Sequence, residues 1–296
     1  MTESLISPSQ LMKATAYEPW LIFDVRHDLS DHQAGRRAYE QGHIPGAKFL
    51  DHEQQLSAPR TGQNGRHPLP TLADLTALMR GFGLRPESRV VVYDASGGAF
   101  AAHLWWMLRW MGHQNVAVLD GGWPAWIAAG GQVEVGSFQG VDSQAASSAK
   151  AQSARAPATP VALAPHMPMV DADIVLANLD KPAFTIIDAR AAERYRGEVE
   201  PMDPVAGHIP GALNRPNSLN LQADGRFKSA EQLREEFKEL IGHLSPNHVV
   251  HQCGSGITAC HNLFAMELAG LTGSALYPGS WSEWCADPTR PIERAS

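Results

Sequence analysis

One cysteine in this sequence lies where a thiol could act as a nucleophile. Cys253 follows a short apolar stretch at 249–252 that is typical of a buried strand, and it precedes a glycine-rich loop and a run at 259–269 with apolar residues at helical spacing. The free N–H groups and the positive dipole end at the start of a helix favour an anion. We therefore expect Cys253 to be a reactive thiolate in a strand–loop–helix unit.

The same loop fits other classes of site less well. Residues 254–259 match the Gly-x-Gly-x-x-Ala pattern of a dinucleotide site, but the acidic ribose partner expected about twenty positions further on is missing from 275–278. A cysteine phosphatase would need an arginine where this chain has Ala259. A buried structural cysteine is the plain alternative, although an inert cysteine does not need flanking glycines.

Composition limits the class of protein and its partners. The chain has 296 residues, of which 44% are hydrophobic and 19% charged, and this fits about two globular domains. Its net charge of −7 argues against a nucleic-acid or membrane partner. Residues 1–7 lack a basic and apolar leader pattern, so we expect a cytoplasmic location. Three cysteines fit reduced thiols. Cys253, Cys260 and His261 could suggest a metal site, but the sequence has no Cys-x-x-Cys pair and no second cluster, so no metal or other cofactor is expected.

The sequence carries two copies of one pattern. A short apolar strand ending in Asp-x-Arg occurs at 21–26 and again at 185–190, and Gly-His-Ile-Pro-Gly-Ala follows at 42–47 and at 207–212. Strands that alternate with helices predict an α/β fold, with a parallel sheet flanked by helices on both faces in each copy. We expect three parts, a first domain at 1–135, an exposed linker at 136–168 and a second domain at 169–296.

Comparison of the two copies separates scaffold from site. The Asp-x-Arg pairs and the Trp-x-x-Trp pairs occur in both copies, so we interpret them as scaffold. Alignment of 89–97 with 248–256 puts Asp94 opposite Cys253. A carboxylate suits an anion-binding loop but cannot carry sulfur. The first domain is therefore expected to be catalytically inactive, and the second to be catalytic.

These motifs together resemble the tandem-domain rhodanese sulfurtransferases over nearly the whole chain. The loop Cys-Gly-Ser-Gly-Ile-Thr-Ala at 253–259 is similar to the Cys-Gly-Ser-Gly-Val-Thr-Ala loop of the 3-mercaptopyruvate branch, from which Ile257 departs. The thiosulfate-specific branch has basic residues after the cysteine, and these would stabilise the departing sulfite dianion. Gly254 and Ser255 are neutral, which favours mercaptopyruvate over the alternative donor, thiosulfate.

The resemblance also implies groups that bind the substrate. Arg194 matches the family's substrate-binding arginine, and Arg196 is a second candidate. The family often has a further arginine in a Pro-Glu-Pro-Arg segment, but 200–204 reads Glu-Pro-Met-Asp-Pro here, which leaves the donor open. The backbone N–H groups that would hold the sulfur anion belong to Gly254, Gly256, Ile257 and Thr258.

A Ser-His-Asp arrangement is the remaining feature that the family implies. By position its members are Ser255, His67 and Glu53, with Glu53 standing where the family has Asp. Such a group could pass a proton during the departure of pyruvate, in a cleft between the domains. An exposed loop histidine is the alternative for His67.

The implied reaction is a two-step sulfur transfer. A small anionic donor leaves sulfur on Cys253 as a persulfide, and a thiol, cyanide or a thioredoxin-like protein removes it, without a cofactor. Thiosulfate:cyanide sulfurtransfer is the nearest alternative. A non-catalytic sulfur-relay or regulatory binding module is the alternative from another class.

Overall fold

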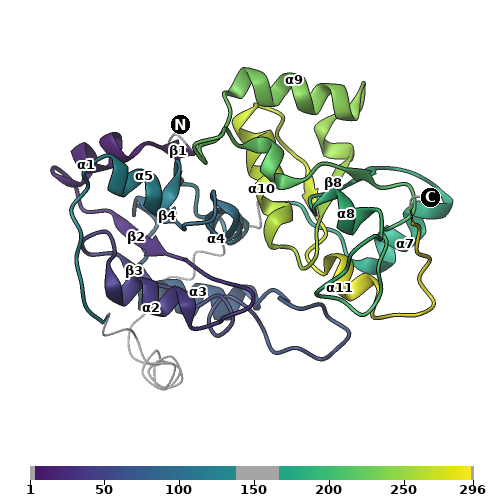
Figure 1. Ribbon diagram of the computed structural model, residues 1–296, viewed down its shortest axis with the longest axis horizontal. Helices are drawn as coiled ribbons and strands as arrows, with labels where there is room; N and C mark the ends of the chain where they lie inside the picture. Colours follow the sequence, from purple (N-terminus) through teal and green to yellow (C-terminus); the bar gives the residue numbers. More distant parts are fainter. Residues whose placement is uncertain (1–3, 138–166, 295–296) are drawn as a thin grey trace.

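The computed structural model describes residues 4–137 and 167–294, which form two halves that lie side by side (Figure 1). Each half contains one parallel sheet covered by helices, so the α/β class expected from the repeat is confirmed. The linker expected at 136–168 lies almost entirely outside the described residues. The domain boundaries therefore stay a prediction.

The first half contains a five-stranded sheet in the order β1-β5-β4-β2-β3, with every pair parallel. Its strands are β1 (Leu5–Ile6), β2 (Leu21–Asp24), β3 (Lys48–Phe49), β4 (Val90–Tyr93) and β5 (Val116–Leu119). Its helices are α1 (Pro8–Thr15), α2 (Ala34–Gln41), α3 (Leu72–Gly81), α4 (Ala99–Trp110) and α5 (Gly122–Ala128). Every residue of β4 and β5 is buried, as expected for parallel strands with helices on both faces.

The second half repeats this plan with four strands in the order β7-β6-β8-β9, again all parallel. Its strands are β6 (Thr185–Asp188), β7 (Leu213–Asn214), β8 (Val249–Gln252) and β9 (Ala275–Leu276). Its helical segments are α7 (Ala172–Asp180), α8 (Ala192–Tyr195), η2 (Asn217–Asn220), α9 (Ala230–Ile241), η3 (Pro246–His248), α10 (Ile257–Leu268) and α11 (Ser280–Trp284). Within the described residues of both halves, no helix has the length and apolar character needed to cross a bilayer.

One hydrophobic cluster spans both halves, and each half has a further cluster of its own. Helices α4 and α10 pack against each other where the halves meet, and Trp105 of α4 meets Phe264 of α10 edge-on with ring centroids 4.8 Å apart (Figure 1). Both helices are buried along most of their length, as expected for helices that are apolar on nearly every face. The glycine loop that begins α10 is therefore held at the boundary between the halves.

The repeated ion pairs support the sheets in the same way in both copies. Arg26 binds Asp24 and donates to the carbonyl of Gly42 at 2.7 Å, while Arg190 binds Asp188 and donates to the carbonyl of Gly207 at 2.8 Å. Each guanidinium lies 4.7 Å from the ring centroid of a tryptophan, Trp123 for Arg26 and Trp281 for Arg190. This duplication is consistent with a scaffold role.

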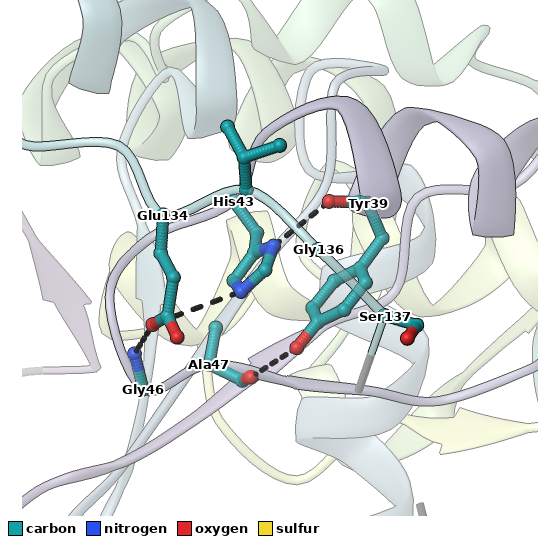
Figure 2. A pocket seen from close by; sticks show the side chains of 8 residues that line it. Tyr39, His43, Gly46, Ala47, Glu134, Gly136 and Ser137 are labelled. Carbon is teal, nitrogen blue, oxygen red and sulfur yellow. Dashed lines mark hydrogen bonds and ion pairs between the residues drawn. The ribbon is translucent and has the colours of Figure 1, made fainter. Parts of the chain in front are cut away.

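The Gly-His-Ile-Pro-Gly-Ala turns are also built alike. In the first copy His43 stacks on Tyr39 with centroids 3.8 Å apart, and Glu134 accepts the N–H of Gly46 at 2.8 Å (Figure 2). Tyr195, His208 and Glu293 form the same arrangement in the second copy. The surface hollow drawn in Figure 2 is lined by the first turn and by 134–137, and it contains no residue of the 253–258 loop. We therefore interpret it as a structural feature of the turn.

Candidate active site

Cys253 stands between the end of β8 and the start of α10. Its Sγ accepts the backbone N–H of Gly256 at 3.2 Å, and its own N–H donates to Ser280 Oγ at 3.1 Å. Gly256 has φ 90°, and a Cβ there would lie 2.5 Å from the carbonyl oxygen of Pro278, so only glycine fits. The helix begins at Ile257, two residues earlier than the sequence indicated, so Ile257 and Thr258 supply free N–H groups of its first turn.

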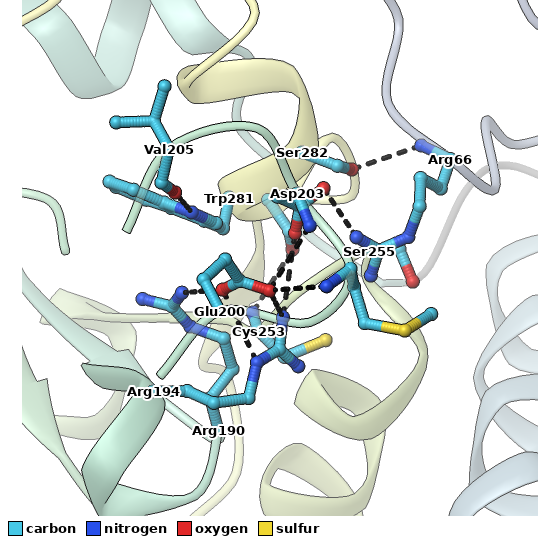
Figure 3. A network of polar contacts seen from close by, with 12 residues as sticks. Arg66, Arg190, Arg194, Glu200, Asp203, Val205, Cys253, Ser255, Trp281 and Ser282 are labelled. Carbon is cyan, nitrogen blue, oxygen red and sulfur yellow. Dashed lines mark hydrogen bonds and ion pairs between the residues drawn. The ribbon is translucent and has the colours of Figure 1, made fainter. Parts of the chain in front are cut away.

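Three guanidinium groups surround the cysteine (Figure 3). A Cβ on Gly254 would lie 2.9 Å from Arg66 Nη2 and 3.5 Å from Arg194 Nη1, so both arginines lie directly on the residue after Cys253. Burial alone would lower the pKa of Arg190, but attraction to Asp188, Glu200 and the Cys253 sulfur raises it overall. The site therefore provides fixed positive charge for an anionic sulfur or substrate.

Two acidic residues balance these charges. Glu200 accepts from Arg194 at 2.6 Å and lies 3.4 Å from Arg190, while Asp203 pairs with Arg66 and lies 3.5 Å from Arg194 (Figure 3). Burial opposes the charge of Glu200, but hydrogen bonds from Arg194 and from backbone N–H groups lower its pKa. Burial raises the pKa of Asp203 in spite of Arg66. Asp203 therefore keeps its negative charge less readily than Glu200 does.

Arg66 is the site residue that sequence reasoning missed. It lies beside His67 in the chain, and its Nε is buried without a hydrogen-bond partner among the described residues. A buried donor without a partner is destabilising unless a ligand satisfies it. Met202 stands where the family's Pro-Glu-Pro-Arg segment has its arginine, and this difference was the available signal that a cation would have to come from another part of the chain.

The structure brings Ser255, His67 and Glu53 together across the two halves. Ser255 Oγ lies 2.7 Å from His67 Nδ1, and His67 Nε2 lies 2.7 Å from Glu53 Oε1. The hydrogen bond from His67 lowers the pKa of Glu53 from its ordinary value of 4.5 to about 2, so Glu53 is ionised at neutral pH. In the tautomer in which Nε2 donates to Glu53, Nδ1 accepts the hydrogen bond from the Ser255 hydroxyl.

Cys253 is buried, whereas the side chain of Arg196 is exposed. Cys253 is only 2% exposed, so a donor can reach its sulfur only if neighbouring groups move. Arg196 is exposed, and its described ion pair is with Glu198, whose Oε1 lies 2.6 Å from its Nε. The structure therefore does not bring Arg196 into the group formed by Arg66, Arg190 and Arg194.

The first copy contains an anion in the corresponding loop. Asp94 Oδ1 accepts the N–H groups of Ser96 and Gly98 at 2.8 and 2.9 Å, and Oδ2 accepts those of Phe100 and Ala101 at 2.8 and 3.0 Å. A carboxylate that accepts several backbone N–H groups is strongly stabilised in its charged form. The strand–loop–helix unit of this fold is therefore an anion-binding site.

Comparisons with known proteins agree with this geometry. The family model described as "Rhodanese-like domain" matches residues 7–129 and 171–287. The chain therefore belongs to the rhodanese family, and it is an enzyme of the tandem-domain sulfurtransferase type.

Individual relatives carry more specific names. A protein of Pseudomonas aeruginosa named "Probable 3-mercaptopyruvate sulfurtransferase" is 45% identical over 99% of both chains. A "Putative thiosulfate sulfurtransferase SseB" of Mycobacterium tuberculosis is 40% identical over 95% of this chain and 93% of its own. The solved structure of a 3-mercaptopyruvate sulfurtransferase from Leishmania major is 30% identical, with a TM-score of 0.78 over 95% of this chain and 73% of that one. These names agree on sulfur transfer and differ on the donor.

Proposed function

We propose that this protein moves sulfur from 3-mercaptopyruvate to an acceptor through a persulfide on Cys253. The observation that carries the proposal is the position of Cys253, with the Gly256 N–H on its sulfur and the Arg66 and Arg194 guanidiniums over the next residue. Two arginines suit the carboxylate and keto group of an α-keto acid, and the loop residues Gly254 and Ser255 are themselves neutral.

In the first step the Cys253 thiolate attacks the donor sulfur. A sulfur–sulfur bond forms, the carbon–sulfur bond of mercaptopyruvate breaks, and its electron pair remains on the pyruvate enolate. The thiol proton of the donor ends on the enolate carbon, which gives pyruvate and a Cys253 persulfide anion. The contact of Ser255 Oγ with His67 Nδ1 at 2.7 Å supports a relay for this proton. The donor carboxylate would replace Asp203 on Arg66 and Arg194.

In the second step an acceptor removes the outer sulfur and restores the Cys253 thiolate. We propose a thiol, cyanide or a thioredoxin-like protein as acceptor, in a cytoplasmic setting. The N–H groups of Gly256, Ile257 and Thr258 would hold the persulfide anion meanwhile, and the four N–H bonds to Asp94 in the first copy support this role. The net charge of −7 supports the absence of a nucleic-acid or membrane partner.

Thiosulfate is the second candidate donor, because three guanidiniums could also receive a dianion and one relative carries that name. Steady-state rates with both donors test the choice. We expect a higher kcat/KM for mercaptopyruvate, and a clear preference for thiosulfate would contradict the proposal. If Cys253→Ser kept the biological activity, a non-catalytic binding module would be indicated in place of an enzyme.

A further inference from the structure

Three potential metal ligands meet beside the Ser255–His67–Glu53 group. Glu53 Oε1 lies 3.8 Å from His27 Nε2 and 3.5 Å from His32 Nδ1. Each of the three residues offers a ligand atom within 4.8 Å of those of the other two. His27 follows β2 closely, His32 belongs to the turn before α2, and Glu53 comes from the segment after β3. The ligands therefore come from three separate segments of the first half.

His27 has a buried ring nitrogen that has no hydrogen-bond partner among the described residues. Its side chain is 4% exposed, and Nε2 makes no hydrogen bond among the described residues although it faces Glu53. A buried ring nitrogen without a partner is destabilising, so this arrangement calls for an explanation. His32 is 53% exposed, and it would give an ion a path from solvent to the buried pair.

We propose that His27, His32 and Glu53 form a binding site for a divalent transition ion of the zinc class. Two imidazoles and a carboxylate are a common ligand set for such ions, with a fourth position left for water. Bonds of about 2.0–2.1 Å in a tetrahedral site put the ligand atoms about 3.3 Å apart. The separations of 3.8 and 3.5 Å from Glu53 are close to this value, and the exposed His32 ring can move to complete the site.

Occupation of this site would compete with the catalytic group. The ion would take Glu53 Oε1, the same atom that accepts from His67 Nε2, while Glu53 Oε2 stays bound to Arg60 at 2.6 Å. His67 would then lose the partner that fixes its tautomer and orientation toward Ser255. The ion is therefore an inhibitor of sulfur transfer, and this second part of the inference rests on the proposed function.

Metal binding is tested without any assay of activity. Full-length Cys253→Ser removes the thiolate that would otherwise bind zinc, and it is titrated with Zn²⁺ by calorimetry and with Co²⁺ by visible absorption. We expect one ion per chain with the visible bands of tetrahedral Co²⁺. Adding His32→Gln should weaken binding at least about tenfold, because loss of even an outer partner of a metal site costs 10- to 100-fold.

His243→Gln is the matched control, because His243 is an exposed histidine outside this cluster. It should bind like the Cys253→Ser parent. The proposed metal site would be contradicted if the Cys253→Ser parent bound no ion, or if adding His32→Gln left its affinity unchanged.

The competition is tested in the chain that keeps Cys253. Each variant is compared with its own rate without metal. His32→Gln should need at least about ten times more Zn²⁺ than the parent for half-inhibition, and His243→Gln should behave like the parent. Equal sensitivity of His32→Gln would overturn the competition, because the ion would then act on the Cys253 thiol itself. If no sulfur transfer is detected at all, the proposed function fails while the titrations still decide the metal site.

Discussion

Asp94 and Cys253 make the same contact in the two halves of the molecule. Each follows a central strand, and each accepts the backbone N–H of the glycine that caps the next helix, Gly98 at 2.9 Å for Asp94 Oδ1 and Gly256 at 3.2 Å for Cys253 Sγ. The first loop is one residue longer, which accommodates the longer carboxylate. The first copy thus places a carboxylate where the second copy places the sulfur of Cys253.

Asp94 is expected to be important for stability and not for chemistry. Asp94→Ala would leave four backbone N–H groups without their acceptor, three of them in buried contacts. Because each unsatisfied buried group costs about 1–3 kcal/mol, we expect the free energy of unfolding to fall by at least about 2 kcal/mol. Urea unfolding measures this change, with the exposed Asp224→Ala as control. A loss no larger than that of the control would contradict the anion-binding role.

Arg66 and Arg194 are expected to bind the donor carboxylate. Since a hydrogen bond to a charged group contributes about 1.5–3 kcal/mol, either Arg→Gln change should raise KM for mercaptopyruvate about 10- to 100-fold. Arg196→Gln is the comparison, and its exposed pairing with Glu198 predicts a much smaller effect. Steady-state kinetics check all three. An unchanged KM for Arg66→Gln would contradict the role of Arg66 in binding the donor.

Ser255 and His67 are expected to affect the chemical step more than donor binding. Loss of a proton relay lowers a rate about 10²- to 10⁴-fold, so Ser255→Ala and His67→Gln should lower kcat in this range with little change in KM. Single-turnover release of pyruvate isolates this step. The account would fail here if both variants raised KM and kept kcat.

Labelling of the three cysteines should follow their ionisation and not their exposure. Burial raises the pKa of Cys285 to about 11, and burial raises the pKa of Cys260 well above its ordinary value. A thiol is protonated below its pKa, so at pH 7 a small alkylating agent should label Cys253 first, and labelling of Cys285 should rise only toward pH 11. Peptide mass spectrometry reads the order. Exposure alone predicts the reverse, because Cys285 is 6% exposed and Cys253 2%.

Much of the fold could be predicted because the chain repeats its local signals. The paired Asp-x-Arg strands and the two Gly-His-Ile-Pro-Gly-Ala turns are short-range patterns, and the structure contains them where the sequence indicated. The sequence pattern predicts a start of α10 that is two residues too late, because Gly256 caps the helix with a positive φ and not with a polar side chain.

The site was harder to predict where it depends on contacts across the halves. Arg66 and His67 reach the second half from one loop of the first half, and the periodicity of the sequence does not report such contacts. Arg194 and Arg196 are two positions apart in the sequence, and the structure shows that Arg194 faces Gly254 while Arg196 pairs with Glu198. Position in the chain alone could not separate them.

The most direct test of the account is the intact mass of the protein after brief mixing with 3-mercaptopyruvate and removal of excess donor. We expect one added sulfur atom, mapped by peptide analysis to Cys253, lost on addition of cyanide and absent from Cys253→Ser. No added sulfur, or sulfur on Cys285 in place of Cys253, would contradict the account.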